Sequence, residues 1–338
     1  MPFDPSALRF AHPIRELVRT RISIRRYTGE PLSGPARDEL ERACSLLRLG
    51  PLGAECRFVL LELAGRGRAA GPTPAGTGAN RRAGAGAAQP AGASPTAGAA
   101  PATAAPVSRP RRLGTYGMIR GARTFLAGAV RASDRALEDF GYLLELLILK
   151  ATDLGLGTCW LGGTFDRSAF ARAIGLRKDE LLPAVTPVGL SAERRDLLEQ
   201  VIRFGAGSAR RRPWAVLFFD GRWSEPLGAA EAGPYAGPLE ALRLAPSASN
   251  RQPWRILRQE RDGPFHLFLR RTPGYGLAAG SDLQRLDMGI AMAHFDLAAA
   301  EDGLRGAWTR LEEPTAPAGT PGLAGPQYIA TWRAEAGS

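Results

Sequence analysis

The chain contains two copies of one helical segment, and this repeat limits the available folds more than any other feature. DFGYLLELLILKATDLGLGTCW begins at Asp139 and DMGIAMAHFDLAAAEDGLRGAW begins at Asp287, and the two align without a gap. The identical residues are Asp139 and Asp287, Gly141 and Gly289, Leu149 and Leu297, Ala151 and Ala299, Gly155 and Gly303, Leu156 and Leu304, and Trp160 and Trp308. Two amphipathic helices of similar composition would share apolar positions, but here glycines and tryptophans match as well. We therefore interpret the repeat as a duplication that gives the chain two related halves.

Helix and strand signals alternate along most of the sequence. Helical spacing of apolar residues covers 15–23, 35–49 and a long segment that starts from a cap at Ser133 and stops near Gly155. Runs of β-branched and aromatic residues predict strands over 57–63, 123–130, 213–219, 253–259 and 265–271. A Gly-rich loop, LGTCWLGGTF, follows the long helix.

A segment of different composition interrupts this pattern from Ala64 to Arg112. It is rich in Gly, Ala and Pro and has few large apolar side chains, so it can bury little surface on folding. We predict a disordered insertion between two strands. Its seven arginines and absence of acidic residues account for +7 of the net charge of +11. Because the charge is not concentrated on a folded face, it argues against a nucleic-acid partner.

Other features of the composition point to a cytoplasmic protein. The three cysteines are widely spaced and form no CxxC pair, which fits neither a disulfide framework nor a zinc site. The N-terminus lacks the apolar run of a signal peptide. The most apolar stretch, Phe140 to Ala151, is charged at two positions and shorter than the about 20 residues that cross a membrane. The histidines are scattered, so we expect no metal site. The shortness of the apolar stretch also leads us to expect no membrane partner.

Two short segments combine polar side chains in patterns that suit ligand binding. In RISIRRY, Arg21, Ser23 and Arg25 alternate with isoleucines, and extended backbone would place them on one face. Two guanidiniums and a hydroxyl suit a phosphate dianion, although a solvated basic stretch at a helix end is the alternative. APSASNRQPW, from Ala245 to Trp254, sets hydroxyl and amide side chains between prolines. We expect a loop whose polar groups bind the polar edge of a ring.

Together with GLGTCWLGG and RRRPW, these two segments resemble the FMN-dependent nitroreductase family. The resemblance implies an α+β, nitroreductase-like fold with two pseudo-symmetric lobes, each a mixed or antiparallel sheet flanked by helices. It also implies an FMN cofactor, with the chemistry at flavin N5 and no catalytic side chain. The residues that it assigns to the FMN phosphate are Arg21, Ser23, Arg25 and Arg211 with its neighbour Arg210; those of the flavin loop are Pro246, Ser247, Ser249, Asn250 and Gln252; and those near N5 are Leu161, Gly162 and Gly163.

The order of the motifs departs from the family pattern. Family members carry the phosphate motif first and the Pro-Ser loop shortly after it, and they build each flavin site across a homodimer interface. Here the N-terminal half has LRLGPLGAECRF in place of the loop, and the C-terminal half has no Arg-x-Ser-x-Arg motif. The chain thus resembles a single-chain, pseudo-dimeric branch, with halves at 1–230 and 231–338 and one FMN site between them. This pairing removes the need for a homodimer without forbidding one.

The resemblance implies an enzyme that passes hydride from NAD(P)H through FMN to a small acceptor, such as a quinone or a nitroaromatic compound. Two alternatives stay open from the sequence. One is a different flavin reaction on the same fold, such as dehalogenation or dehydrogenation. The other is a degenerate flavin-binding protein without activity.

Overall fold

The computed structural model describes residues 8–63, 113–192, 211–261, 263–275, 277–278, 281–311 and 325–335. The predicted insertion, 64–112, lies outside the described residues. The earlier elements are α1 (Ile14–Thr20), α2 (Gly34–Leu46), β1 (Cys56–Glu62), β2 (Thr124–Arg131), α3 (Ala136–Asp153), β3 (Gly157–Thr158), α4 (Arg167–Ala173), β4 (Glu180–Leu181) and β5 (Val185–Gly189). The later ones are η3 (Trp214–Val216), β6 (Phe218–Asp220), β7 (Arg222–Pro226), η4 (Gly233–Tyr235), α6 (Ala236–Leu244), η5 (Ala248–Asn250), β8 (Trp254–Arg258), β9 (Phe265–Leu269), β10 (Leu277–Ala278), β11 (Ser281–Asp282), α7 (Leu283–Glu301), β12 (Gly306–Thr309) and β13 (Gln327–Ala334).

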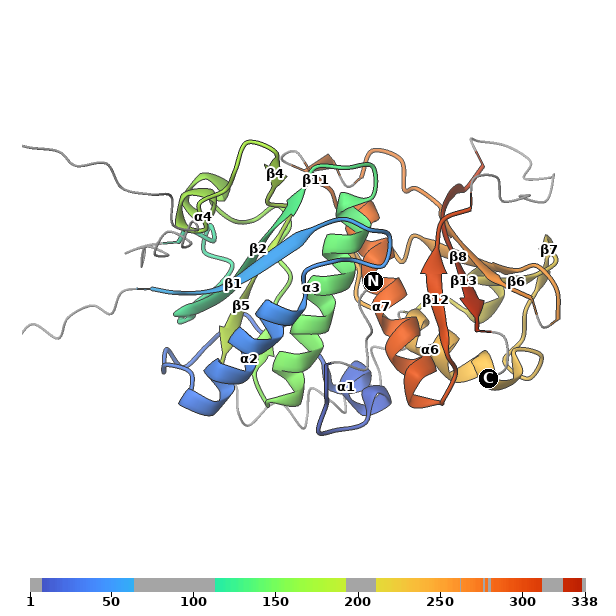
Figure 1. The fold of residues 1–338 in the computed structure, drawn as a ribbon, viewed down its shortest axis with the longest axis horizontal. Coiled ribbons are helices and arrows are strands. Elements are labelled where there is room, and N and C mark those ends of the chain that lie inside the picture. The colour runs from blue at the N-terminus through green and yellow to red at the C-terminus, as the bar shows by residue number, and fades with distance from the viewer. Residues whose placement is uncertain are drawn as a thin grey trace, which may run out of the picture.

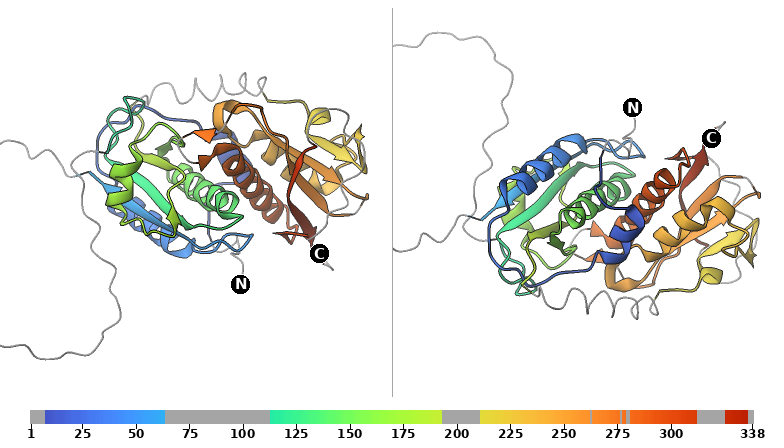
Figure 2. Two further views of the ribbon diagram at one scale, coloured as in Figure 1. Left: turned by 90° about the horizontal axis from the view of Figure 1, so that it is seen from above. Right: turned by 90° about the horizontal axis from the view of Figure 1, so that it is seen from below.

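Two sheets stand on either side of a central pair of helices, α3 and α7 (Figures 1 and 2). The first sheet has the order β1-β2-β5-β3, with β4 paired to β2. The second has the order β12-β13-β9-β8-β6-β7, in which only the β6–β8 pairing is parallel. The α+β fold expected from the sequence is confirmed. Strands β6 and β7 precede residue 231 but extend the second sheet.

The two sheets are built by the same succession of elements. A helix, two strands, a second helix and two further strands appear as α2, β1, β2, α3, β3 and β5, and again as α6, β8, β9, α7, β12 and β13. The first series also has α4 and β4 between its last two strands, and the second also has η5 before β8 and the short strands β10 and β11 before α7. The pairing order β1-β2-β5-β3 matches β8-β9-β13-β12. Each succession also has one short motif before its first strand, LRLGP ending at Pro51 and LRLAP ending at Pro246. The two halves therefore share one topology.

The repeated glycines lie where α3 crosses α7. A Cβ atom on Gly289 would overlap the backbone carbonyl of Glu138, and one on Gly141 would overlap that of Leu286. Each glycine thus faces the residue three positions before the other glycine, so the contact is reciprocal. The helices approach so closely that only glycine fits at either position.

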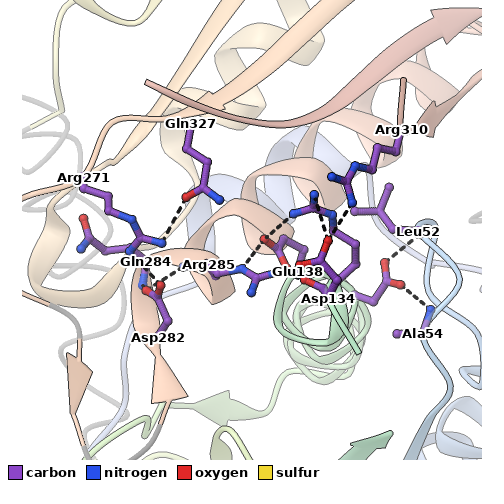
Figure 3. Close-up of polar contacts among 12 residues, drawn as sticks. Leu52, Ala54, Asp134, Glu138, Arg271, Asp282, Gln284, Arg285, Arg310 and Gln327 are labelled. Atoms are coloured by element: carbon purple, nitrogen blue, oxygen red, sulfur yellow. Dashed lines mark hydrogen bonds and ion pairs between the residues drawn. The ribbon is translucent and has the colours of Figure 1, made fainter. Parts of the chain in front are cut away.

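The repeated aspartates hold matching loops in the two halves. Asp139 accepts the N–H groups of Leu52 at 2.8 Å and Ala54 at 2.7 Å, one on each carboxylate oxygen (Figure 3). Asp287 Oδ1 accepts the N–H of Ala248 at 2.9 Å, while its buried Oδ2 has no hydrogen-bond partner in the described chain. Burial raises the pKa of Asp287 well above its usual range. Asp287 therefore holds its loop through one hydrogen bond, where Asp139 makes two.

This difference predicts unequal effects of one conservative substitution. Asp139→Asn should lower the free energy of unfolding by about 1–3 kcal/mol, because an amide NH₂ would then face a backbone N–H. Asp287→Asn should lower the free energy of unfolding by less than about 1 kcal/mol, because the amide nitrogen can take the place of Oδ2, which accepts no hydrogen bond among the described residues. Urea denaturation of the two variants measures the difference, and equal losses would contradict this account of the loops.

Some predicted elements differ from the structure. Ser133 does not cap α3; the helix begins at Ala136, and its N-cap Arg135 makes no side-chain cap bond. The strand predicted over 213–219 is divided into η3 and β6, because the backbone turns at Trp214–Val216 before pairing begins. No helix in the described part of the chain is long and apolar enough to cross a membrane.

Candidate functional site

The segment RISIRRY lies at the edge of the first sheet beside β3. Ser23 forms a single parallel bridge with Thr158, and the Ile24 N–H donates to the Thr158 carbonyl at 2.8 Å. Isolated bridges of this kind hold the segment against the sheet without making it a full strand. Ser23 and Arg25 are exposed, whereas Arg21 is only 5% exposed.

The three predicted phosphate ligands act on the pKa of one thiol, that of Cys159. Burial raises the pKa of Cys159, while the positive charge of Arg25, a hydrogen bond with Ser23 and the charge of Arg21 act in the opposite direction. Ser23 is bridged to Thr158, the residue before Cys159, so the segment that carries Arg21, Ser23 and Arg25 runs beside this thiol. Their joint role in phosphate binding stays a prediction.

The predicted flavin loop, 246–252, has a strained backbone. Ser249, Asn250 and Gln252 have φ angles of 48°, 54° and 50°, in the left-handed region that residues other than glycine rarely adopt. Ser247 Oγ accepts the Gln252 N–H at 2.9 Å, and Gln252 Nε2 donates to Asn250 Oδ1 at 3.1 Å. Strain persists where such contacts enforce it, and it is typical of ligand sites.

Arg211 is bound to the start and the middle of the late loop. Its Nη1 donates to the Ala245 carbonyl at 2.6 Å and to Asn250 Oδ1 at 3.1 Å. Burial, and next the charge of Arg21, lower the pKa of Arg211 to about 10. The charge of Arg21 is thus near enough to act on Arg211. Arg210, the other basic residue predicted here, lies outside the described residues.

The Gly-rich segment after β3 lies where the second half packs on the first. A Cβ atom on Gly162 would crowd Leu283 Cδ2, at the start of α7, at 2.5 Å. Gly163 is exposed. The N–H of Leu161 donates to the Val185 carbonyl at 2.9 Å, so it is not available to a ligand. The placement of Leu161, Gly162 and Gly163 near flavin N5 stays a prediction.

A buried acidic residue behind Arg21 was not predicted from the sequence. Glu145 of α3 is fully buried, and its Oε2 accepts the indole N–H of Trp160 at 2.7 Å. Its Oε1 lies 2.8 Å from His294 Nε2 and 4.0 Å from Arg21 Nε. In the sequence, the signal for such a residue was a charged side chain, Glu145, within a mostly apolar helical segment.

The contacts of His294 fix the number of protons in this network. Nδ1 lies 3.1 Å from the Ala241 carbonyl, which can only accept, so Nδ1 carries a hydrogen. Nε2 faces a carboxylate oxygen of Glu145, and two bare acceptors would repel each other at that distance. One further proton must therefore lie between them, which makes the Glu145–His294 pair neutral overall. The pair leaves the charge of Arg21 uncancelled.

These residues fit the phosphate of FMN. Arg21 Nε is buried and has no hydrogen-bond partner among the described residues. A buried guanidinium donor of this kind is costly unless an anion accepts from it. Arg25 and Arg211 add two more cations close by.

These features define an α+β protein with a cationic site beside α3, one of the two helices between its sheets. The chain belongs to a nitroreductase family, because the model of the family described as "Putative TM nitroreductase" matches residues 103–299, more than half of the sequence. No protein in the curated collection matches the chain.

Solved structures resemble the chain at low sequence identity. A "putative nitroreductase" from Thermotoga maritima is 17% identical, with 96% of this chain and 94% of that chain covered and a TM-score of 0.48. A nitroreductase family protein from Clostridium novyi NT is 14% identical, with coverage of 56% and 92% and a TM-score of 0.32. An FMN-dependent nitroreductase from Clostridium difficile R20291 is 14% identical, with coverage of 52% and 87% and a TM-score of 0.33.

Proposed function

We propose that the protein is an FMN-dependent oxidoreductase of the nitroreductase type. It takes hydride from NAD(P)H and passes it to a small quinone, nitroaromatic or other electrophilic acceptor. The main support for this proposal is the buried guanidinium of Arg21, whose Nε has no hydrogen-bond partner in the described chain. Arg211, whose pKa the charge of Arg21 helps to lower, donates to Asn250 in the strained loop, and we propose that one ligand binds both arginines.

Each part of the site has a separate task. Arg21, Ser23, Arg25 and Arg211 would hold the phosphate, and the loop 246–252 would hold the ring edge through its hydroxyl and amide groups. Gly162 and Gly163 would let the backbone approach the ring. FMN, when bound, supplies the hydride-transfer chemistry, and the protein supplies orientation and the local electrostatic field.

We propose one FMN per chain, bound between halves 1–230 and 231–338. Ion pairs lie around Arg310 (Figure 3), and we propose that they occupy the location that mirrors the site. Arg310, two residues after Trp308, stands where the repeat matches Gly162, and its Nη1 pairs with Asp134 at 2.7 Å. Nearby, Arg285 makes two bonds of 2.6 Å to the buried carboxylate of Glu138. These side chains take the space and the charge that a second flavin would need.

Anaerobic reduction tests the proposed reaction. The FMN-loaded protein should lose its flavin absorbance when NADH or NADPH is added, and it should oxidise the nucleotide continuously when a quinone or nitroaromatic acceptor is present. Failure of both nucleotides to reduce the bound flavin would contradict the proposed donor. Reduction without turnover of either acceptor would instead favour a different flavin reaction or a binding protein.

The neutral Glu145–His294 pair leads to a prediction for FMN affinity. Glu145→Gln should change the Kd for FMN by less than about threefold, because the substitution removes no net charge. His294→Gln should weaken FMN binding roughly tenfold, about 1.4 kcal/mol, because an unpaired carboxylate would then compete for Arg21 and repel the phosphate.

Quenching of flavin fluorescence on titration measures both constants, and the double variant is the control. Glu145→Gln with His294→Gln should restore the Kd of the unmodified protein, because no carboxylate is left. Much tighter FMN binding by Glu145→Gln alone would show that the pair carries a negative charge, contrary to the proton count.

A further inference from the structure

Two arginine side chains and the main-chain N–H of a third arginine donate to the peptide units 251–253, at the end of the strained loop. Arg212 Nε donates to the first carbonyl of this stretch at 3.3 Å, and Arg255 Nη1 donates to the second at 3.2 Å. The Arg270 N–H donates to the third at 2.8 Å. The three residues are thus anchored around one short length of backbone, next to the residues predicted to hold the flavin.

The register of the second sheet directs two of these arginines to the same side. In the antiparallel pairing of β8 and β9, Arg255 stands opposite Phe268, so Arg270 is its diagonal neighbour on the same face. The other face of β9, which carries Phe265, packs on Phe295 of α7. Arg255 and Arg270 therefore lie on the face turned away from the central helices.

Arg255 is a buried cation for which the described chain provides no carboxylate. It is 5% exposed, and its Nε has no hydrogen-bond partner among the described residues. Arg258, three residues further along β8, is 3% exposed and is held by Asp220 at 2.9 and 2.7 Å. The chain neutralises one buried arginine of this strand and leaves the other without a counter-ion.

The neighbouring charges make the arrangement unfavourable as it stands. Burial, and next the charges of Arg212 and Arg270, lower the pKa of Arg255 to about 9. Arg212 and Arg270 are both exposed, so the cluster is open to solvent on their side. An anion placed among the three guanidiniums would relieve the repulsion and accept from the unused donors.

We propose that Arg212, Arg255 and Arg270 form a binding site for a phosphate dianion, separate from the FMN phosphate site. Guanidiniums present paired N–H donors that match phosphate oxygens, and three cations suit a dianion better than a single carboxylate. The phosphate is either free or carried by a nucleotide. That a nicotinamide nucleotide supplies the phosphate rests on the proposed function. Arg211 and Arg212 both donate to the loop 246–252, so the two proposed sites adjoin this loop.

Thermal unfolding with inorganic phosphate tests the site in the Arg21→Ala/Arg25→Ala background, where the FMN phosphate site is disabled. At constant ionic strength, saturating phosphate should raise the Tm of this parent by about 3–5 °C. Arg270→Ala, at an exposed position, should reduce the shift by more than half. Arg255→Met should abolish it and should raise the Tm without phosphate, because it removes an uncompensated buried charge. Arg222→Ala, an exposed arginine of β7, is the control and should respond as the parent does.

The source of the phosphate is read from the same assay with NADPH and NADH. A Tm rise at lower concentrations of NADPH than of phosphate, lost in Arg270→Ala, assigns the site to a nucleotide; a response to phosphate alone assigns it to the free anion. Equal phosphate shifts in the parent and Arg270→Ala, or loss of the shift in Arg222→Ala, would overturn the proposal. Because the background does not depend on FMN, these results stand whether or not the protein binds flavin.

Discussion

Alanine at both Arg21 and Arg25 should leave the purified protein without bound FMN. Each guanidinium offers a charge-assisted hydrogen bond to the phosphate, and such bonds contribute about 1.5–3 kcal/mol each. Loss of both corresponds to a Kd for FMN that is weaker by roughly 10²–10⁴-fold. Flavin absorbance after size-exclusion chromatography, followed by titration with FMN, measures the loss.

Arg26→Ala is the matched control, because Arg26 is an exposed arginine of the same segment and is not among the predicted phosphate ligands. This variant should keep its flavin. The thermal unfolding of each variant checks that the chain still folds. Full FMN content in the folded double variant would mean that the phosphate binds elsewhere.

Gly289→Ala should be the most destabilising single substitution among those considered. Its Cβ would overlap the Glu138 carbonyl on α3, and a backbone atom cannot move aside as a side chain can. We expect the free energy of unfolding to fall by about 3 kcal/mol, the upper end of the usual cost of overpacking. Urea denaturation measures the change.

Gly34→Ala provides the comparison. Gly34 is the first residue of α2, and a Cβ there would meet no atom within 4 Å. Because alanine also favours the helix, this variant should be neutral or slightly more stable, by up to about 1 kcal/mol. A similarly small effect of Gly289→Ala would show that α3 and α7 are less closely packed than described.

Local sequence patterns predicted the parts of this molecule that depend on short-range geometry. The spacing of apolar residues gave most helices and strands within a few positions, and the repeat identified Gly141 and Gly289 before their contacts were known. Glycines at matching places in two helices are a direct consequence of a close helix crossing. The loop 246–252 was recognisable because its polar residues and prolines favour turns.

The interactions that decide the charge of the site could not be predicted in this way. Glu145 and His294 are distant in the sequence, and only the packing of α3 on α7 brings them to 2.8 Å. The burial of Arg21 and the commitment of the Leu161 N–H to Val185 depend on the same tertiary arrangement. A spacing pattern places residues on a face but does not show which element covers that face.

The flavin content of the purified chain tests the central claim most directly. After reconstitution with excess FMN and removal of the free cofactor, absorbance at flavin wavelengths against protein concentration should give about one FMN per 36.0 kDa chain. Two FMN per chain would contradict the proposal that the ion pairs around Arg310 fill the location of a second flavin. A colourless protein that cannot be reconstituted would contradict the proposed cofactor itself.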